Sequence, residues 1–378
     1  MIQSQDRFAT WAQLPARLLL AAMAMLLVAS ALVPIRAGKQ ETDVVGFAEN
    51  VAGTANKAAE RPRDDDLALY DRVIARIGQG EDYYKVAAEE HRKADYPLRP
   101  GVAVRLPTLA HLAVLLGDTG RGAEVVVPGL LLAAFALLAV TLIVWWRRLG
   151  DEGVSPSTRR IATAFLFFGV SLGLNRYYFV LHELWAGMLV ALAMGLYRPG
   201  QKWLAALAVA ALALATREHV LPFVLLLAAM AFWRRDWKEG AAWSALIAAF
   251  FAYLTWHLGQ VALQVLPSDP TGPNWLELRG LSGWLSNVVL SSNLRLLPHF
   301  IAGPLVVLAV FGWAGWKTPA GTLATLLYLG YGLAFMIAGR PDNFYWGAVI
   351  APAMFVGLAF VPMAGRSLGR AARTSAAQ

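Results

Sequence analysis

Apolar runs separated by short polar turns dominate this sequence and restrict the folds open to it. With 58% hydrophobic and 15% charged residues among 378, the chain is too apolar for an ordinary soluble domain. We therefore predict an all-α polytopic integral membrane protein with about ten transmembrane or re-entrant helices. The apolar runs fall near residues 18–35, 123–146, 161–174, 184–197, 203–216, 220–233, 240–263, 298–316, 320–338 and 344–363.

The positive charges of the chain follow the turns between these runs. Residues 36–108 hold 12 Lys/Arg against 13 Asp/Glu, so the net charge of +8 comes from the rest of the sequence. Because Lys and Arg in short loops favour the cytoplasmic side, the pattern is a topology signal and not a nucleic-acid footprint. It predicts a multi-pass protein of the bacterial cytoplasmic (inner) membrane, with both termini cytoplasmic. The predicted cytoplasmic cations are Arg7, Arg17, Arg147, Arg148, Arg159, Arg160, Arg198, Lys202, Arg234, Arg235, Lys238, Lys317, Arg366, Arg370 and Arg373.

The same topology divides the chain into one membrane domain and a tail. Residues 1–363 form the predicted membrane domain, with a large extracytoplasmic first loop at 36–108 that contains short helices. A second outer segment at 264–297 reads as a Pro- and Gly-rich loop followed by an interfacial helix. Residues 364–378 are small and basic, and we predict a disordered cytoplasmic tail.

Four of the apolar runs have only 14 residues, which gives roughly 21 Å of helix against a hydrocarbon core of ~30 Å. The turns that join them, 175–183 and 216–219, are therefore expected below the outer surface, facing a protein-lined cavity. A charge at this depth costs at least ~2.5 kcal/mol unless it is paired or hydrated. One interpretation is that these charges pair and fix helix packing; the other is that they bind substrate, with Arg217 on a lipid-linked phosphate. The residues concerned are His182, Glu183, Arg217 and Glu218.

Three consecutive acids, Asp64, Asp65 and Asp66, open a segment of the first loop with apolar residues at helical spacing. The simplest interpretation is helix capping, with Asp66 at the N-cap position. The functional alternative is a general base that removes the proton of an acceptor hydroxyl. The triplet permits a divalent metal ion without requiring one, and the chain has no metal-type His/Cys spacing.

Further candidates lie near the predicted outer surface. Tyr84 belongs to a group of loop aromatics suited to stacking on a sugar or to packing at the interface. Arg99 and Arg105 lie where the chain re-enters the membrane, so they meet lipid headgroups or hold a substrate phosphate. Arg340 lies at the last outer turn, beside aromatic residues that are typical of a membrane-interface belt.

Several of these segments together resemble the GT-C type of membrane glycosyltransferase. The segments are Asp-x-x-x-Tyr (Asp66, Tyr70), Gly-x-x-x-Tyr (Gly80, Tyr84), YPLRP (96–100), RLPTLAHL (105–112), LHELWAG (181–187), TREH (216–219) and GRPDNFYW (339–346). The resemblance implies a polyprenyl-phosphate-linked sugar donor, a glycan, lipid or protein acceptor, and chemistry on the extracytoplasmic side. In that superfamily an acid of the first outer loop is the usual base, which carries over to Asp66, with Asp65 next. Here this acid follows the first span by some 30 residues, and Asp43 and Glu49 occupy the nearer position.

Two other functions remain open at the level of sequence. A transporter or flippase for a lipid-linked or small polar solute is expected to carry charges along the middle of its spans and broken helices at matching positions in two halves. An O-antigen polymerase or ligase handles similar lipid-linked glycans but usually has its large loop late in the chain. In this sequence the charges lie at the outer ends and the large loop comes first, which favours the transferase.

Overall fold

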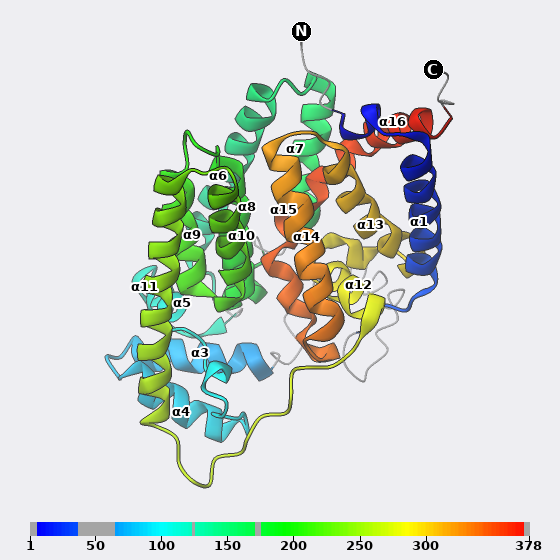
Figure 1. Cartoon of the computed structure of the whole chain (residues 1–378). Helices are drawn as coiled ribbons and strands as arrows, with labels where there is room; N and C mark the ends of the chain where they lie inside the picture. Colours follow the sequence, from blue (N-terminus) through cyan, green and yellow to red (C-terminus); the bar gives the residue numbers. More distant parts are fainter. Residues whose placement is uncertain (1–5, 37–64, 123–124, 171–174, 374–378) are drawn as a thin grey trace.

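The computed structural model describes residues 6–36, 65–122, 125–170 and 175–373 (Figure 1). Within these ranges the chain is helical and contains no strand, as the apolar runs predict. The α-helices are α1 (Gln13–Leu32), α3 (Asp65–Ile77), α4 (Tyr83–Lys93), α5 (Thr108–Leu115), α6 (Pro128–Asp151), α7 (Pro156–Val170), α8 (His182–Leu196), α9 (Leu204–Thr216), α10 (Leu221–Trp233), α11 (Trp237–Ala262), α12 (Gly280–Leu290), α13 (His299–Gly315), α14 (Pro319–Ile337), α15 (Ala351–Met354) and α16 (Val361–Arg373). Short 3₁₀ segments include η1 (Arg7–Thr10), η6 (Glu218–Val220), η8 (Pro341–Val349) and η9 (Phe355–Phe360).

Five helical stretches in the described residues are long and apolar enough to cross a membrane. The prediction of a helical membrane protein is confirmed at this level, whereas the count of ten crossings stays a prediction. Helices α7, α8, α9, α10 and α13 are shorter, as the 14-residue runs of the sequence indicate for four of them. The five long stretches are Gln13–Leu32, Pro128–Asp151, Trp237–Ala262, Pro319–Ile337 and Ala351–Arg373.

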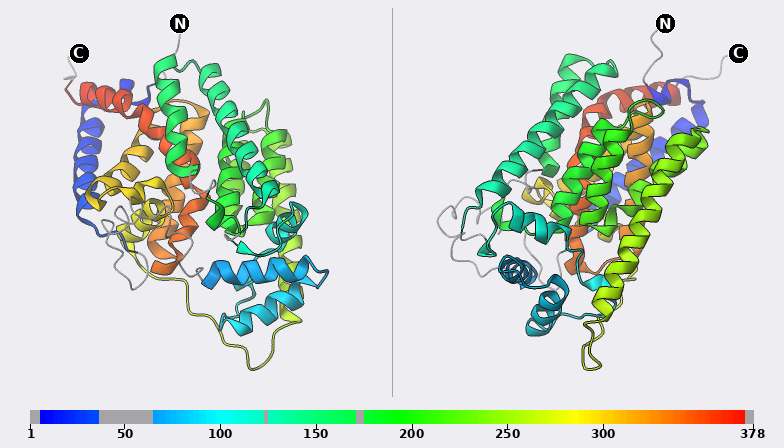
Figure 2. Two further views of the ribbon diagram at one scale, coloured as in Figure 1. Left: turned by 180° about the vertical axis from the view of Figure 1, so that it is seen from behind. Right: turned by 90° about the vertical axis from the view of Figure 1, so that its left-hand side faces the viewer.

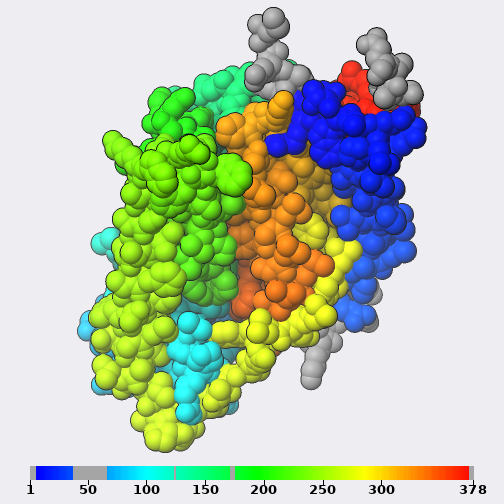
Figure 3. Space-filling view, viewed as in Figure 1, coloured from blue at the N-terminus to red at the C-terminus, as the bar shows by residue number. Residues whose placement is uncertain are grey.

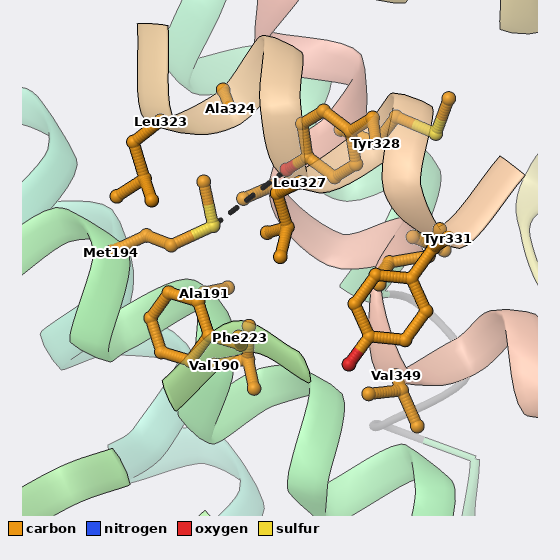
Figure 4. Close-up of a cluster of buried hydrophobic side chains, with 14 of the residues drawn as sticks. Val190, Ala191, Met194, Phe223, Leu323, Ala324, Leu327, Tyr328, Tyr331 and Val349 are labelled. Atoms are coloured by element: carbon orange, nitrogen blue, oxygen red, sulfur yellow. Dashed lines mark hydrogen bonds between the residues drawn. The ribbon is translucent and has the colours of Figure 1, made fainter. Parts of the chain in front are cut away.

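Helix α8 forms the centre of the bundle. Every residue from His182 to Gly195 is buried. A helix that is apolar all round is stable only where neighbours cover all its faces, and α8 packs against α6, α9, η8 and α15. Figure 4 shows its contact with α10 and α14, where the Tyr328 hydroxyl lies 3.8 Å from the sulfur of Met194. This core holds the N-terminus of α8 in a fixed position.

The run 344–363 is predicted as one span, but the structure breaks it into η8, α15 and η9 before α16 begins. Proline residues interrupt regular hydrogen bonding here, with Pro341 opening η8 and Pro352 in α15. The broken backbone also packs closely against its neighbours. A Cβ on Gly187 would lie 1.9 Å from the carbonyl oxygen of Ala348, so only glycine allows η8 to approach α8 this closely.

Two other predictions need correction. The tail predicted as disordered from residue 364 is helical to Arg373, because its small apolar residues form one face that packs on α1 and α13. The helix predicted to lie in the interface within 264–297 is α12, and its residues from Gly283 to Val289 are buried between η8, α13 and α14. Its apolar stripe therefore contacts protein.

Helices α3 and α4 lie at the end of the molecule opposite both chain termini (Figures 1 and 2). They are held together by Glu90 of α4, which is 2% exposed and pairs with Arg72 and Arg76 of α3, each at 3.0 Å. The chain between α11 and α12 reaches this layer and then runs across the molecule below α14 (Figure 3). Arg92 of α4 pairs with Asp269 of this segment at 2.8 Å. Helices α3, α4 and the segment 263–279 therefore form one connected layer.

Candidate functional site

The Glu183 carboxylate lies in the first turn of α8, fully buried between two arginines. Its Oε1 lies 2.7 Å from Nε of Arg217 and 3.6 Å from Nη2 of Arg105. The Arg217 N–H does not point along the short contact, so neither oxygen of Glu183 accepts a hydrogen bond from the residues that the structure describes. Among the described residues the carboxylate is therefore held by two ion pairs, and neither of its oxygens has a hydrogen-bond partner.

Arg217 links Glu183 to the turn between α9 and α10. It directly follows α9 in an extended conformation, which directs the chain into η6. Its Nη1 donates to Oε1 of Glu218. His219 lies beside this carboxylate, with Nδ1 3.6 Å from the same oxygen, and its ring packs on Trp346 at 4.5 Å between centroids. The two turns, which the sequence predicts to lie below the outer surface, thus contact each other through Glu183 and Arg217.

Arg105 joins this pair of turns to the outer helices. Its Nε donates to the hydroxyl of Tyr70 on α3 at 2.9 Å. Its Nη2 donates to the hydroxyl of Tyr345 on η8 at 3.2 Å. Burial raises the pKa of Tyr70, which the positive charge of Arg105 opposes and the negative charge of Asp66 reinforces. Arg105 therefore connects three separate parts of the chain at one point.

A small cavity lies against this cluster, with about 10 Å³ of space for the centre of a water molecule. His182 lines it together with Tyr70, Tyr83, His91 and Arg105. The His182 side chain is 3% exposed, and neither ring nitrogen has a hydrogen-bond partner among the described residues. A cavity of this size holds about one water molecule.

Asp66 lies at the edge of the cluster. Its Oδ1 accepts a hydrogen bond from the Tyr96 hydroxyl, and it lies one helical turn before Tyr70 on the same face of α3. The carboxylate is half-buried. Helix α3 begins at Asp65, so Asp66 lies inside the first turn and not at the N-cap position that the sequence predicts. Asp64 and the side chain of Asp65 lie outside the part of the chain that the structure describes.

Three predicted substrate residues have other partners. Arg99 donates to the backbone carbonyl of Asp269 in the segment after α11. The hydroxyl of Tyr84 lies 3.1 Å from Nδ1 of His257 on α11, which fixes α4 against that helix. Arg340, the N-cap residue of η8, pairs at 2.8 Å with Asp342 in the first turn of that helix. No contact joins any of the three directly to Glu183.

Two hydroxyls that hold Arg105 were not among the predicted site residues. The sequence interpretation placed Tyr345 in an aromatic belt, and it named Tyr70 among the loop aromatics and as part of the Asp-x-x-x-Tyr segment. Each tyrosine follows an aspartate in the sequence: Tyr70 comes after Asp66 in the segment Asp-x-x-x-Tyr, and Tyr345 comes after Asp342 in the segment RPDNFY. Neither pattern indicates that the phenol would turn towards a buried guanidinium, because that depends on how η8 and α3 pack.

A second fully buried glutamate provides an internal comparison. Glu239 of α11 accepts hydrogen bonds from the Tyr197 hydroxyl at 2.6 Å, the Gly200 backbone at 2.8 Å and Arg234 at 3.0 Å. Its hydrogen-bonding capacity is used, as expected of a carboxylate that only fixes packing. Glu183 has the same burial but none of these hydrogen bonds. The contrast singles out Glu183 and its neighbours as a candidate binding site.

The described residues contain no group of three or more His, Cys, Asp or Glu side chains placed to hold a metal ion. Comparison of the chain with protein-family models, with curated proteins and with solved structures finds no match. The resemblance to GT-C glycosyltransferases therefore rests on the sequence segments quoted above.

Proposed function

We propose that this protein is an inverting membrane glycosyltransferase. It moves a sugar from a polyprenyl-phosphate donor to an acceptor hydroxyl on the extracytoplasmic face, with Asp66 as general base. The observation that carries the proposal is the unused hydrogen-bonding capacity of Glu183 and His182, gathered with two arginines directly beneath the helix that bears Asp66. Buried polar groups without partners are costly, and such a cluster is typical of a site that a polar ligand completes.

Each residue has a chemical role in this proposal. The acceptor oxygen attacks the anomeric carbon from the face opposite the leaving group, and the carbon–oxygen bond to the lipid phosphate breaks. Asp66 takes the acceptor proton. Arg105 and Arg217 stabilise the negative charge of the departing phosphate, for which planar guanidinium groups are well suited. Glu183 positions both arginines.

Donor binding requires the outer layer to move. The cavity beside His182 has room for about one water molecule, which is far less than a sugar phosphate needs. Arg105 donates to Tyr70 of this layer and also contacts Glu183 and Tyr345, so it lies where the layer meets the bundle. Separation of α3 and α4 from the bundle would open the space between Asp66 and Arg217.

The proposal is tested with purified protein, polyprenyl-phosphate sugars and candidate acceptors. We expect Asp66→Asn to lower the rate of transfer by about 100-fold or more, because general bases typically contribute 10²–10⁴-fold. The asparagine keeps an oxygen that accepts from Tyr96, so the local structure is retained. Asp151→Asn is the matched control, since Asp151 is an exposed acid at the end of α6.

An unchanged rate of sugar transfer by the Asp66→Asn variant would overturn the assignment of Asp66 as the base. It would leave the proposal that the protein is a glycosyltransferase in place. Asp65→Asn and Asp64→Asn would then be measured in the same assay. If the wild-type protein transfers no sugar but moves a labelled polyprenyl-phosphate sugar between the leaflets of vesicles, the transferase proposal fails and a flippase takes its place.

A further inference from the structure

Helix α16 differs in orientation from the helices of the bundle. In Figures 1 and 2 it lies crosswise at the end of the molecule where both termini are found, whereas α1 and α14 run along the bundle. One face is apolar: Ala364, Leu368, Ala371 and Ala372 pack with Phe8, Ala16 and Phe311. The protein therefore covers the apolar face of α16, whereas the arginines of the opposite face are exposed.

That opposite face is a row of arginines. Arg366, Arg370 and Arg373 follow at intervals of four and three residues, so they lie on one side of the helix, and all three are exposed. Like charges at this spacing destabilise a helix. Arg370 donates from Nε to the carbonyl of Arg366, and a further anionic partner along this face would reduce the repulsion and favour the helical state.

The position of α16 along α1 indicates what that partner is. Nε of Arg17 on α1 donates to the carbonyl of Ala372 at 3.0 Å, so α16 ends at the level of the second turn of α1. Leu14 and Leu18, which flank Arg17, are 67% and 62% exposed. An exposed apolar surface on a candidate membrane helix faces lipid. Helix α16 thus lies where the lipid-facing surface of α1 begins.

Aromatic residues at the same end of the bundle also indicate that this end lies at the membrane surface. Trp233 and Trp237 flank the turn between α10 and α11 and are 90% and 67% exposed. The turn lies at the end that carries α16 (Figure 1). Exposed tryptophans at the ends of apolar helices are typical of the membrane–water interface.

We propose that α16 lies in the headgroup layer of the membrane and that Arg366, Arg370 and Arg373 bind the phosphates of anionic phospholipids. Guanidinium groups recognise phosphate by two parallel hydrogen bonds, which lipid phosphates on a surface can supply to three arginines at once. The inference is independent of the transferase proposal, since it concerns the opposite end of the molecule.

The first experiment measures depth in the bilayer. The chain has no cysteine, so Gly365→Cys gives a single site for a nitroxide label, and a Cβ there meets nothing within 4 Å. Gly330→Cys on α14 is the reference for the apolar interior, because it is equally open and lies in the middle of that helix. We expect the label at 365 to report headgroup depth from its collisions with oxygen and with a soluble nickel chelate. A label as exposed to the chelate as one in bulk water would overturn the proposal.

The second experiment measures the choice of lipid. Purified protein is titrated with phosphatidylglycerol or phosphatidylcholine in detergent, and the thermal midpoint is read. We expect phosphatidylglycerol to raise the thermal midpoint at a concentration about tenfold or more below the concentration of phosphatidylcholine that has the same effect. The difference between the two lipids should disappear when Arg366, Arg370 and Arg373 are replaced by glutamine.

The matched control replaces Arg147, Arg160 and Lys238 by glutamine, which removes the same charge from exposed positions outside α16. This variant is expected to keep the preference for phosphatidylglycerol. Equal preference in the α16 variant and the wild type would overturn the proposal. So would an equal shift with inorganic phosphate alone, which would identify a soluble anion as the ligand.

Discussion

At the scale of single residues, the surroundings of two buried glutamates distinguish a carboxylate that fixes packing from one that could bind a ligand. Glu239 is surrounded by donors that use its oxygens, whereas Glu183 is held only by the charges of Arg105 and Arg217. Burial of a carboxylate costs several kcal/mol unless charges and hydrogen bonds compensate. Glu183 lacks the second kind of compensation among the described residues. It is therefore the carboxylate whose surroundings change most if a polar ligand enters.

We expect Glu183→Gln and Glu239→Gln to differ in activity more than in stability. Each removes one partner from a buried ion pair, a change that typically costs about 3–5 kcal/mol. Transfer activity per folded molecule should fall strongly only in Glu183→Gln, because only this variant loosens both arginines of the site. Thermal unfolding in detergent gives the folded fraction, and sugar transfer gives the activity. Equal specific activities of the two variants would show that Glu183 serves packing alone.

The surroundings of some site residues could be predicted from the sequence, whereas those of others could not. The charges of the turns 175–183 and 216–219 were predicted either to pair with one another or to bind substrate. Glu183 and Arg217 do pair, as the first interpretation predicts. Arg99 and Arg340 were predicted as substrate residues because they are charged and lie near the membrane surface. That position indicates the depth of a side chain but not the direction in which it points. In the structure Arg99 donates to the carbonyl of Asp269 in the segment after α11, and Arg340 donates to the carboxylate of Asp342.

At the scale of elements, the pair α3 and α4 depends on buried groups that titrate. His91 of α4 is 5% exposed, and its Nδ1 lies 2.7 Å from the carbonyl of Ala87. Burial lowers the pKa of His91 to about 4; the contact with Ala87 opposes the shift and the charge of Arg105 adds to it. The imidazole is therefore neutral in the folded protein at pH values where it is charged in the unfolded chain.

We expect the α3–α4 pair to lose stability as the pH falls from about 6.5 towards 4. In this window the unfolded chain binds a proton that folded His91 does not, so unfolding becomes easier, by roughly 3 kcal/mol at the lower limit. Hydrogen exchange of peptides from α3 and α4 at pH 7 and pH 5, corrected for intrinsic rates, measures the effect. His91→Asn should remove the pH dependence. Asp269 does not interfere, since its hydrogen bonds with Arg92 and the Leu266 backbone lower its pKa to about 2.

Helical periodicity predicted most elements but not the breaks within them. The pattern Leu67, Tyr70, Val73, Ile74 and Ile77 corresponds to α3, which ends before Gly78. The run 344–363 has the composition of a span. Pro352 interrupts it, and its division into η8, α15 and η9 also depends on contacts with α8 and α13 that composition does not record. Helix α16 was missed because small and basic residues are also typical of disordered tails.

At the scale of the whole molecule, the two ends differ in charge and in content. One end holds both termini, α16 and the turns after α6, α8, α10 and α13, where the predicted cytoplasmic cations lie (Figures 1 and 2). The other end holds α3, α4 and the segment after α11. The predicted cytoplasmic cations, which are spread along the sequence, thus gather at one end of the molecule.

Single cysteines in this cysteine-free chain test the orientation. We expect a membrane-impermeant maleimide to label Gln79→Cys, next to α3, in intact spheroplasts. Gln201→Cys, between α8 and α9, should react only after the membrane is opened. Both positions are exposed, so a difference in labelling reports the side of the membrane. The reverse pattern would place both termini outside and would remove Asp66 from the extracytoplasmic face.

The path of the chain through the site has a consequence for biogenesis. Tyr70, Arg105, Glu183, Arg217 and Tyr345 come from segments spread over most of the sequence. A ribosome that has synthesised the chain only as far as α14 has supplied both arginines and Glu183, but not the hydroxyl on η8 that fixes Arg105. The charge cluster must therefore wait in the membrane, incompletely held, until roughly the last tenth of the protein, residues 338–378, has been inserted. Any factor that shields polar side chains during insertion would act on this nascent intermediate, before the finished bundle exists.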